Sequence, residues 1–566
     1  MYRQENASNG GVVSERRFEM SSEPVAKSKP FAITLDVGTS LLNKTGTWRT
    51  ERPVYLDRLP PCNNACPAGE NIQAWLSHAE EGDYEAAWRQ IMEDNPLPAT
   101  MGRVCYHPCE GACNRAGLDQ AVGINSVERF LGDQALMHGW KVEPGTATGK
   151  RVMIVGAGPA GLSAAYHLSR FGYEVTVFDA NPQAGGMIRY GIPKYRMPRE
   201  KLRAEVARIE AMGVEIELGT RIDDVLATKR EGRFDAVFLC IGAQLPRRVE
   251  IASDGEIPIL DAAAVLRDTE LDNPNQLKGE VVVYGGGNTA MDVARTAIRM
   301  GALSVTVIVF EARAHMPAHS FEVKEAQEEG AVLRCLRSIK RVDGRFVTLE
   351  RMRETHENWP EPTGEFDRVE ADVVVLAVGQ DIDIGFLGTV PGVEIKDGIA
   401  QIDGAMRTGA DGIFAGGDMV PSLRTVTTAI GHGKKAARNI DAFLRGEACV
   451  PAEKHEIATE DLLNTWYYSD ADRTMQPTLE LIRRQSGFAE VVGDLDESNA
   501  LFEARRCMSC GNCFECDNCY GMCPDNAIIK LGPGKRFEFK YDYCKGCAMC
   551  ATECPCGAIK MMPEDI

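Results

Sequence analysis

The C-terminal part of the chain carries two cysteine runs with identical spacing, and this feature limits the possible folds more than any other. The first run is Cys513, Cys516, Cys519 and Cys523, and the second is Cys544, Cys547, Cys550 and Cys554. In both runs two residues separate the first three cysteines, three residues precede the last one, and a proline follows. Such spacing gathers soft thiolate ligands on one loop, as an iron–sulfur cluster requires. The pattern therefore predicts two [4Fe-4S] clusters.

The last cysteine of each run is expected to reach the cluster of the other run, as in bacterial two-cluster ferredoxins. One cluster would then take Cys513, Cys516, Cys519 and Cys554, and the other Cys544, Cys547, Cys550 and Cys523. A pair of zinc sites is the alternative, because Cys-x2-Cys also suits tetrahedral zinc. Interlocked runs that each end in Cys-Pro favour the clusters, so residues 506–566 are expected to form an α+β ferredoxin-like domain that moves single electrons.

Composition limits the setting in which these clusters would work. The chain has 566 residues, 44% of them hydrophobic, which predicts three or four domains with ample cores. Its net charge of −19, without a long basic run, argues against nucleic acid as a partner. The 19 cysteines stand mostly in short runs and indicate metal ligands in a reducing compartment. The polar N-terminus lacks a signal-peptide core and no apolar run has the length of a membrane span, so we expect a soluble cytoplasmic protein without a membrane partner.

A glycine-rich turn begins the first nucleotide-binding unit. The segment RVMIVGAGPAGLSAAYHLSRFGYEVTVFDA reads as strand, turn, helix and second strand, and it ends near Asp179. The turn contributes Gly156, Gly158, Pro159, Ala160 and Gly161. Such glycines allow a tight turn and close approach of a pyrophosphate to the helix N-terminus, and the acid accepts bonds from ribose hydroxyls. The segment predicts dinucleotide binding.

A second unit of the same kind follows roughly 130 residues later. Its turn contributes Gly285, Gly286, Gly287, Asn288, Thr289 and Ala290, with alanine at the third fingerprint position. Each turn alone could be an ordinary tight βα connection. Two of them favour the two-nucleotide architecture of flavin–nicotinamide oxidoreductases, which are built from two Rossmann-like α/β domains.

Three further segments assign FAD to the first unit and NAD(P) to the second. Gly186, Met187 and Arg196 follow the first unit's second strand, where isoalloxazine contacts are expected. Strands DAVFLCIGA and DVVVLAVGQ, the latter containing Gly379, are expected where the chain crosses between the nucleotide domains. Gly417 and Asp418 resemble a flavin-closing segment in which the acid binds the ribitol, and a helix starting near Thr425 would direct Val426 and Thr427 at the flavin O2 edge. The alternative is that Asp418 is a simple turn residue.

The chain resembles the small (beta) subunit of bacterial glutamate synthase, the large subunit of ferredoxin-NADP transhydrogenase and the N-terminal half of dihydropyrimidine dehydrogenase. The motifs CNNACP, MGRVCYHPCEGACNR, INSVERF, GAGPAG, YGIPKYR, GGGNTAMD and FAGGD carry this resemblance across roughly residues 60 to 445. It implies a helical N-terminal Fe-S domain, FAD, NAD(P)H and service as the electron-input or electron-output arm of a larger enzyme.

The resemblance implies one N-terminal cluster held by Cys66, Cys105, Cys109 and Glu128. A carboxylate ligand is unusual, and the alternative is that Glu128 is a helix-surface residue. A second N-terminal cluster retains only Cys62 and Cys113, because residues 1–61 lack the upstream Cys-x2-Cys of the family.

Cys507 and Cys510 are candidates for the two missing ligands, because EARRCMSCGNC resembles the absent N-terminal segment. We hypothesise that this pair folds back to complete the cluster of Cys62 and Cys113. An unused remnant or a zinc half-site is the alternative. Cys240, Cys335, Cys449 and Cys556 fit no ligand spacing and are expected to be core or surface residues.

The second unit indicates NAD(H) rather than NADP(H). Its second strand ends in Phe310 and Glu311, where NADP-linked relatives carry paired arginines. A carboxylate accepts bonds from a ribose 2′-hydroxyl and repels a 2′-phosphate. Arg313 keeps NADP(H) open as the alternative.

The sequence predicts six segments with different roles. They are an extended polar arm (1–57), a helical Fe-S domain (58–148), an FAD domain (149–275 and 376–447), an NAD(P) domain (276–375), a connector (448–505) and the ferredoxin domain (506–566). No acid–base dyad or nucleophile stands out, so no catalytic side chain is predicted, and no redox Cys-x2-Cys lies beside the flavin units.

The predicted function is an NAD(P)H-dependent, diaphorase-like electron-transfer subunit that serves a partner oxidoreductase. The partner would be a large subunit of glutamate synthase type or a 2-oxoacid:acceptor oxidoreductase. A stand-alone NAD(P)H:ferredoxin oxidoreductase and a non-catalytic assembly subunit with structural clusters are the alternatives. The sequence leaves open the terminal substrate and the direction of electron flow.

Overall fold

The computed structural model describes residues 44–47, 49–247, 249–271, 277–355, 359–450, 453 and 455–564. The chain divides into two compact units, which are described separately. The large unit contains Leu56–Cys513 and Pro555–Ala558. The small unit contains the described residues up to Tyr55 together with Phe514–Cys554 and the residues from Ile559 onward. Residues 1–43 of the expected polar arm lie outside the described residues.

The large unit begins with a helical domain. Its elements are α1 (Pro61–Ala65), α2 (Ile72–Glu80), α3 (Tyr84–Met92), α4 (Pro98–Val104), α5 (Pro108–Gly111), η2 (Asn114–Gly117) and α6 (Ile124–His138). The side chains of Asn71 and Asp83 cap α2 and α3 by accepting bonds from backbone N–H groups of the first turn. Trp75 and Trp88 are fully buried on these two helices, so apolar burial at helical spacing holds the domain together.

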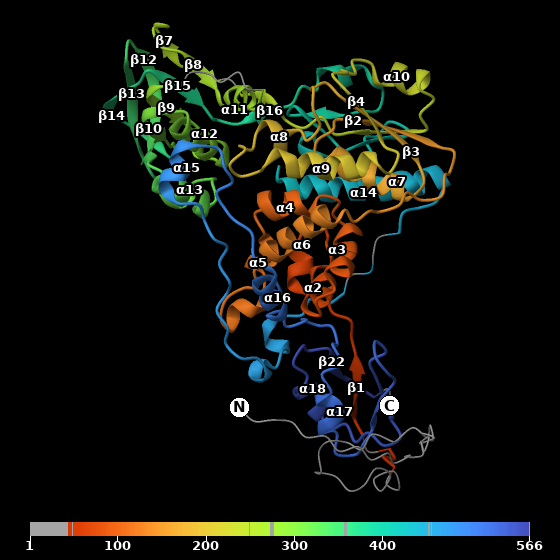
Figure 1. Cartoon of the computed structure of the whole chain (residues 1–566). Coiled ribbons are helices and arrows are strands. Elements are labelled where there is room, and N and C mark those ends of the chain that lie inside the picture. The colour runs from red at the N-terminus through yellow and green to blue at the C-terminus, as the bar shows by residue number, and fades with distance from the viewer. Residues whose placement is uncertain are drawn as a thin grey trace, which may run out of the picture. The chain divides into compact units, whose positions relative to one another are not determined.

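A five-stranded parallel sheet forms the centre of the first nucleotide domain. Its strand order is β19 (Ile413–Ala415), β5 (Ala236–Leu239), β2 (Arg151–Val155), β3 (Glu174–Asp179) and β4 (Glu215–Leu218). Strands β2 and β5 are almost wholly apolar and buried, as expected for a parallel sheet covered on both faces. The helices α7 (Pro159–Arg170) and α14 (Val426–Arg445) pack side by side (Figure 1).

The second nucleotide domain contains another five-stranded parallel sheet. Its order is β11 (Val332–Arg334), β10 (Ala302–Ile308), β9 (Gly279–Tyr284), β15 (Val373–Leu376) and β8 (Ile259–Asp261). Beside it lies a four-stranded sheet of β14 (Glu361–Glu370), β13 (Phe346–Arg353), β12 (Arg337–Asp343) and β7 (Ala252–Ser253). Two parallel sheets, each led by a glycine turn, confirm the predicted pair of Rossmann-type domains.

The remaining elements of the large unit connect or cover these sheets. They are α8 (Met187–Tyr190), α9 (Arg199–Glu210), α10 (Val225–Glu231), β6 (Leu245–Pro246), α11 (Ala262–Glu270), α12 (Asn288–Arg299), η3 (Arg313–His315), α13 (Ser320–Glu328), β16 (Gln380–Asp381), η4 (Gly385–Thr389), β17 (Ile395–Lys396), β18 (Ile399–Ala400), η5 (Gly417–Met419), η6 (Glu460–Leu462), η7 (Thr465–Tyr467), α15 (Leu481–Ser486) and α16 (Glu497–Arg505). Helix α16 packs on α2 and α6, so the end of this unit returns to its beginning.

The small unit is built from short strands and two short helices. Strand β20 (Ile528–Lys530) pairs antiparallel with β21 (Phe537–Phe539), and α17 (Asn518–Met522) lies near α18 (Met549–Thr552). Strand β1 (Glu51–Tyr55) pairs antiparallel with β22 (Ile559–Pro563). Residues from the expected polar arm therefore add a strand to this unit. Among the described residues, no helix is long and apolar enough to cross a membrane.

Candidate functional site

The first glycine turn is shaped by close backbone packing. Gly156 has a φ of +114°, and a Cβ there would lie 2.4 Å from the carbonyl oxygen of Cys240. A Cβ on Gly161 would lie 1.9 Å from the carbonyl oxygen of Gly156. Helix α7 starts at Pro159 without a side-chain cap, so its first N–H groups are available to a pyrophosphate. These features fit a dinucleotide.

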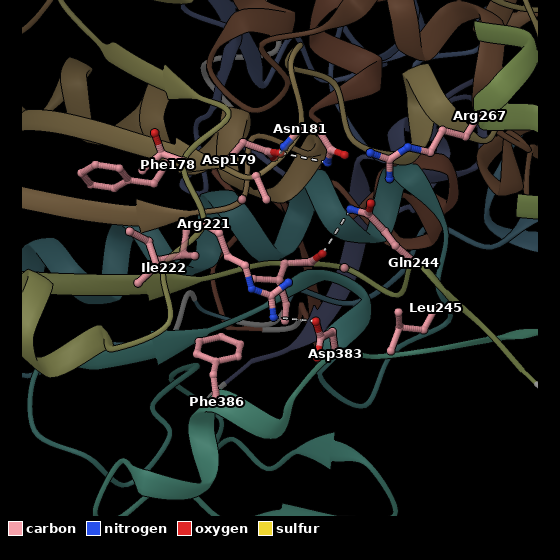
Figure 2. Close-up of a pocket in the computed structure, with 16 residues that line it drawn as sticks. Phe178, Asp179, Asn181, Arg221, Ile222, Gln244, Leu245, Arg267, Asp383 and Phe386 are labelled. Atoms are coloured by element: carbon pink, nitrogen blue, oxygen red, sulfur yellow. Dashed lines mark hydrogen bonds and ion pairs between the residues drawn. The ribbon is translucent and has the colours of Figure 1, made fainter. Parts of the chain in front are cut away.

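One pocket of about 320 Å³ opens at the carboxyl edge of the first sheet (Figure 2). Asp179 lines it, and its Oδ2 accepts a bond of 2.7 Å from the backbone N–H of Ala157, while its Oδ1 accepts bonds from Asn181. The predicted acid therefore also fixes the glycine turn. Phe178 and Phe386 give the pocket apolar walls, which suit an adenosine.

Polar residues of this pocket were missed by sequence reasoning. Asn181, Arg221 and Gln244 line it, each shortly after a parallel strand, and Arg267 joins them from α11. Ligands of open α/β sheets bind beyond the carboxyl ends of the strands. That rule, applied to the ends of β3, β4 and β5, would have found the first three.

A second pocket of about 340 Å³ shares the Gly156 turn and extends toward the second domain. The predicted residues that line it are Gly156, Gly158, Pro159, Ala160, Asp179, Gly186, Met187, Arg196, Asn288, Thr289, Gly417, Asp418 and Val426. Its volume and the N-terminus of the 20-residue helix α14 fit a flavin ring. Burial raises the pKa of Asp418, and Arg424 opposes that rise.

The closing segment of this pocket is held by a residue that carried no sequence signal. The backbone N–H of Gly417 donates a bond of 3.2 Å to Nδ1 of His432, which lies on α14. Burial lowers the pKa of His432, favouring the neutral ring that this bond requires. Thr425 caps α14 by accepting a bond from the N–H of Thr428.

Arg196 lines the second pocket, but its guanidinium is committed to carboxylates. Nη1 lies 2.9 Å from Oδ2 of Asp292, and Nη2 lies 2.6 Å from Oε1 of Glu322. The contact with Glu322 is a close ion pair without hydrogen-bond geometry. Arg196 thus joins the first domain to α12 and α13 of the second, besides facing the pocket.

The second glycine turn lies at the start of α12. Gly285 has a φ of +149° and a Cβ there would lie 2.2 Å from the carbonyl oxygen of Ala377. Helix α12 follows Gly287 without a side-chain cap, and Asn288 accepts a bond from the N–H of His319. Ala290 is buried in α12, while Gly379, with a φ of +116°, precedes β16. These features again fit a pyrophosphate.

Glu311 lies against this turn. A Cβ on Gly286 would lie 2.9 Å from Oε2 of Glu311. Arg313 is exposed and bonds instead to Oε1 of Gln327 at 3.1 Å. The Glu311 carboxylate therefore lies beside the glycine turn, whereas the Arg313 guanidinium is bonded to Gln327.

Cys66, Cys105, Cys109 and Glu128 come together in the helical domain. Burial raises the pKa of the Cys109 thiol, and the charges of Cys105, Cys66, Glu110 and Glu128 raise it further. Glu128 is buried rather than on a helix surface, and its Oε1 accepts a bond of 2.9 Å from Asn95. The donor set of three thiols and one carboxyl fits the cluster that the resemblance implies.

Glu70 is a second buried carboxyl beside these thiols, and sequence reasoning missed it. Asn95 donates to its Oε1 at 3.0 Å as well as to Glu128. Burial raises the pKa of Glu70 to about 7, the charge of Asp94 adds to the rise, and Lys434 opposes it. Its place in CNNACPAGE, four residues after Cys66, was the available signal.

Cys62, Cys113, Cys507 and Cys510 form a second group of neighbouring thiols in the large unit. Burial raises the pKa of the Cys62 thiol, and the charges of Cys113 and Cys510 add to the effect. Burial likewise raises the pKa of the Cys507 thiol, and the charges of Cys510, Cys62 and Cys113 raise it further. The structure thus brings together cysteines from both ends of the large unit.

The small unit holds seven of the eight cysteines of the C-terminal runs, and Cys513 is assigned to the large unit. Burial raises the pKa of Cys550 to about 12, and the charges of Cys544, Cys519, Cys523 and Cys547 add to it. Cys516 is exposed and Cys554 is buried. The sulfur of Cys523 accepts a bond of 3.2 Å from the N–H of Ala527. An all-thiol donor set fits [4Fe-4S] clusters.

Among the described residues, no group of three or more His, Cys, Asp or Glu side chains has the arrangement of a site for a metal ion. Cysteines outside the predicted sets have other contacts. Cys240 is buried beside the first glycine turn and its thiol donates to the carbonyl oxygens of Val155 and Gly156. Cys556 is buried, and Cys449 is exposed.

Comparison with known proteins identifies two family models. Residues 150–433 match the pyridine nucleotide-disulphide oxidoreductase family. Residues 51–140 match domain II of dihydropyrimidine dehydrogenase, which is described as a 4Fe-4S cluster domain.

Three relatives illustrate the similarity. The beta subunit of the NADP(+)-dependent formate dehydrogenase of Moorella thermoacetica is 35% identical, over 80% of this chain and 70% of the relative. The beta subunit of the NADPH-Fe(3+) oxidoreductase of Geobacter sulfurreducens is 34% identical, over 80% and 75%. The NAD-dependent dihydropyrimidine dehydrogenase subunit PreT of Salmonella typhimurium is 31% identical, over 69% and 92%.

These matches confirm the family resemblance and the expectation of an oxidoreductase with FAD, NAD(P) and [4Fe-4S] cofactors. The family model covers half of the chain, and the Moorella subunit is similar over most of its own length. The chain belongs to the pyridine nucleotide-disulphide oxidoreductase family and carries, in addition, a [4Fe-4S] domain of the dihydropyrimidine dehydrogenase type.

Proposed function

We propose that this chain is an electron-transfer subunit in which the flavin pocket and an iron–sulfur site share one wall. Val104 and Tyr106 line the second pocket together with Gly417 and Asp418. Both flank Cys105, one of the four residues proposed to hold the nearer N-terminal cluster. This shared wall is the observation that carries the proposal, because electrons move between cofactors only over short separations.

The glycine turns and the two aspartates of the proposed site then have separate roles in cofactor binding. The turns Gly156–Gly161 and Gly285–Ala290 present backbone N–H groups to the two pyrophosphates. Asp179 and Asp418 accept bonds from the ribose and ribitol hydroxyls of FAD. Bound FAD supplies the exchange between two-electron chemistry with nicotinamide and one-electron chemistry with clusters. No side chain is assigned as a general acid or base.

We propose that the nicotinamide coenzyme is NAD(H). The support is the position of Glu311 against Gly286, where a carboxylate accepts bonds from a 2′-hydroxyl and repels a 2′-phosphate. Relatives carry names of both kinds, NADP for the Moorella and Geobacter subunits and NAD for the Salmonella subunit. The residue at this position, rather than the names, supports the preference.

We further propose that the electrons pass to or from a separate catalytic subunit. The relatives are named as subunits of a formate dehydrogenase, a ferric iron oxidoreductase and a dihydropyrimidine dehydrogenase. A glutamate synthase-type or 2-oxoacid:acceptor large subunit is the proposed partner for this chain.

The test begins with anaerobically purified protein mixed with NADH in a stopped-flow spectrometer. Flavin bleaching followed by loss of the broad cluster absorbance is the expected result. Reduction of the clusters by NADH in FAD-depleted protein would contradict the proposed order. Purification from the native cell then separates the alternatives: a stoichiometric large subunit supports the subunit role, whereas a lone chain that rapidly reduces added ferredoxin supports the stand-alone reductase.

A further inference from the structure

We propose that Cys62, Cys113, Cys507 and Cys510 hold one [4Fe-4S] cluster that is assembled from three separate segments of the chain. The inference deepens the proposed function, on which its role in electron transfer rests. Its ligands would be two thiols from the helical domain and two that lie almost 400 residues later.

The four thiols are mutual neighbours in a largely apolar setting. Cys62 lies on α1, Cys113 immediately precedes η2, and Cys507 and Cys510 follow α16. Cys62, Cys113 and Cys507 pack against the same hydrophobic cluster, which includes Trp75 of α2. Cys62 lies within electrostatic reach of Cys113 and Cys510, and Cys507 lies within electrostatic reach of Cys510, Cys62 and Cys113. Neutral thiols can be buried there, but four neighbouring thiols that bind no ligand would be unusual in a protein core.

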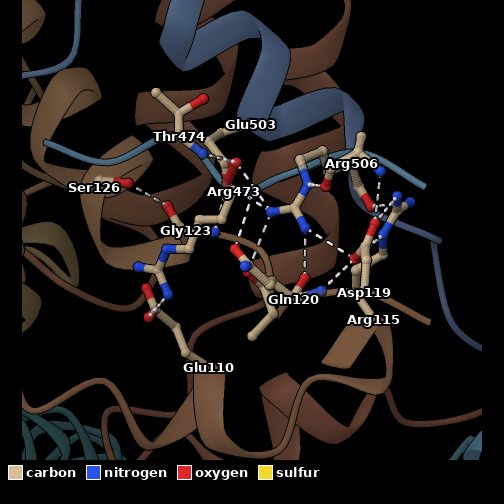
Figure 3. A network of polar contacts seen from close by, with 12 residues as sticks. Glu110, Arg115, Asp119, Gln120, Gly123, Ser126, Arg473, Thr474, Glu503 and Arg506 are labelled. Carbon is tan, nitrogen blue, oxygen red and sulfur yellow. Dashed lines mark hydrogen bonds and ion pairs between the residues drawn. The ribbon is translucent and has the colours of Figure 1, made fainter. Parts of the chain in front are cut away.

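The segment that carries Cys507 is anchored by buried charges (Figure 3). Arg506 is 2% exposed, and its Nη2 lies 3.0 Å from Oδ1 of Asp119, while Nη1 lies 3.0 Å from Oε1 of Glu503. Glu503 is fully buried and its Oε2 accepts a bond of 2.7 Å from the N–H of Gly123. Arg115 lies 2.6 Å from Asp119.

This network joins the last turn of α16 to the loop that follows Cys113. Buried charged groups are costly unless they are fully paired, and such networks are best attested as devices that fix one arrangement. Truncating either side would leave an uncompensated charge in the interior. The docking of the C-terminal pair onto the helical domain is therefore built into the fold.

A second set of contacts holds the segment on the far side of the cysteine pair. The carbonyl oxygen of Gly511 accepts a bond of 3.3 Å from the N–H of Arg58, four residues before Cys62. Gly511 has a φ of +76°, and a Cβ there would lie 2.6 Å from Cβ of Arg58. Ser509 accepts a bond of 3.1 Å from the side chain of Gln73. Cys507 and Cys510 are thus fixed from both sides next to Cys62.

The backbone of this pair resembles that of the predicted cluster loops. Two residues after Cys507, Ser509 has a left-handed φ of +47°, and its N–H donates to the sulfur of Cys507 at 3.5 Å. Two residues after Cys105, His107 has a φ of +40° and its N–H donates to the sulfur of Cys105 at 3.2 Å.

The same left-handed residue occurs in both C-terminal runs, at Glu515 two residues after Cys513 and at Gly546 two residues after Cys544. A non-glycine residue in this conformation is uncommon and needs a reason. The need to turn N–H groups toward a sulfur ligand supplies that reason, because such bonds stabilise cluster thiolates. An unused remnant would have no cause to keep the strained turn.

The site would connect the flavoprotein to the C-terminal clusters. Only two residues separate Cys510 from Cys513, which is the first predicted ligand of the C-terminal clusters. Two consecutive Cys-x2-Cys pairs, Cys507/Cys510 and Cys513/Cys516, would therefore bind two different clusters along one short stretch of backbone. An electron leaving the helical domain would enter the C-terminal runs at this stretch.

The test measures iron, acid-labile sulfide, zinc and FAD per chain in anaerobically purified variants. Cys507→Ser with Cys510→Ser should lose about four irons and four sulfides relative to the wild type and keep its FAD. Cys62→Ser, on the other side of the site, should lose the same four. The variant that combines all three changes should lose no more than either alone. Cys335→Ser with Cys449→Ser, at cysteines outside every predicted set, is the matched control and should lose none.

Unchanged iron in both the Cys507/Cys510 and the Cys62 variants would overturn the proposal, as would losses that add up to about eight irons in the combined variant. Zinc that disappears in place of iron would also overturn it. The Cys62→Ser result decides the question where the double variant is insoluble. Failure of NADH to bleach the flavin of the wild type would instead defeat the proposed function, and it would leave the iron count of these variants unaffected.

Discussion

The hydroxyl of Thr427 donates a hydrogen bond of 3.1 Å to the sulfur of Cys105. Thr427 lies in the first turn of α14, next to Val426, which lines the second pocket. Cys105 directly follows α4 and belongs to the proposed nearer cluster. One hydrogen bond therefore joins the helix that faces the flavin pocket to a cluster ligand.

Replacing Thr427 by valine should lower the midpoint potential of this cluster. A hydrogen bond to a thiolate stabilises the reduced, more negative cluster more than the oxidised one. A bond worth about 1 kcal/mol corresponds to about 40 mV for a one-electron couple. A redox titration monitored by electron paramagnetic resonance measures the shift.

Thr428→Val is the matched control for this change. Thr428 lies on the same helical turn, but its hydroxyl is paired with that of Thr425 at 2.8 Å rather than with a cysteine. Its substitution should leave every cluster potential in place. Equal shifts in the two variants would show that the helix, and not the bond to Cys105, sets the potential.

The sequence predicted the glycine turns and the cysteine sets because each rests on local spacing. Tight βα turns and Cys-x2-Cys loops require particular residue types at fixed separations. The sequence alone was therefore sufficient to predict the roles of Gly156, Gly285 and the cysteine run that starts at Cys544. The proximity of Cys507 to Cys62 was predicted only by analogy, since nothing local joins segments so far apart.

Residues that act through tertiary placement could not be predicted. His432 bonds to Gly417 from the second turn of α14, and Glu70 and Glu128 share the donor Asn95. Arg196 was expected to contact cofactor, yet its charge is matched by Asp292 and Glu322 on helices of the other domain. Such partners depend on how domains pack, which no residue spacing encodes.

Tyr55→Phe should lower the potential of a C-terminal cluster. The Tyr55 hydroxyl lies 3.3 Å from the sulfur of Cys519, and a thiolate at that position can only accept the bond. Tyr55 also stacks on Phe539 with ring centroids 4.8 Å apart, a contact that phenylalanine keeps. A decrease of about 40 mV is expected from the loss of one bond of about 1 kcal/mol.

Tyr541→Phe provides the control in the same unit. Its hydroxyl donates to the carbonyl oxygen of Pro53 at 2.9 Å rather than to a sulfur. The potentials of both C-terminal clusters should be unchanged in this variant. A wild-type potential in Tyr55→Phe would show that β1 serves only to extend the sheet with β22.

Glu311→Gln should weaken the preference for NADH. Removing a charge beside the proposed 2′-position relieves the repulsion of a phosphate, worth about 1 to 2 kcal/mol at partly exposed sites. The kcat/KM for NADPH in flavin-dependent dye reduction should rise about tenfold, and that for NADH should fall severalfold. Arg313→Ala is the control and should leave both values in place. A wild-type enzyme that already favours NADPH would refute the assignment.

Arg196→Met should destabilise the large unit by about 3 to 5 kcal/mol. It removes the counter-charge of buried Asp292 and the nearer of the two counter-charges of Glu322, which keeps only Arg295 at 3.7 Å. The side chain of Glu322 is fully buried and that of Asp292 is 6% exposed. Urea unfolding monitored by protein fluorescence measures the change. Arg247→Met is the control: its pair with Asp381 is 56% and 52% exposed, so a loss below about 1 kcal/mol is expected. Equal losses would contradict the role given to the buried pair.

His167 should make the protein sensitive to mild acid. It is 3% exposed on α7, and its Nε2 lies 3.3 Å from the carbonyl oxygen of Asp94. Burial, together with the charges of Lys434 and Arg170, lowers its pKa from 6.5 to about 3. The native ring therefore stays neutral while the unfolded ring binds a proton below pH 6.5. The contribution of the neutral His167 ring to the free energy of unfolding is fully present above pH 6.5 and is lost as the pH falls toward 3.

The loss attributable to His167 at pH 5 is about 2 kcal/mol relative to neutral pH. His167→Gln retains a donor for Asp94 but cannot bind a proton, so its unfolding free energy should fall by about 2 kcal/mol less between pH 7 and pH 5. Urea unfolding at the two pH values measures the difference. His138→Gln, at an exposed position of α6, controls for acid loss of clusters and should follow the wild type. Parallel behaviour of His167→Gln and the wild type would place the acid sensitivity elsewhere.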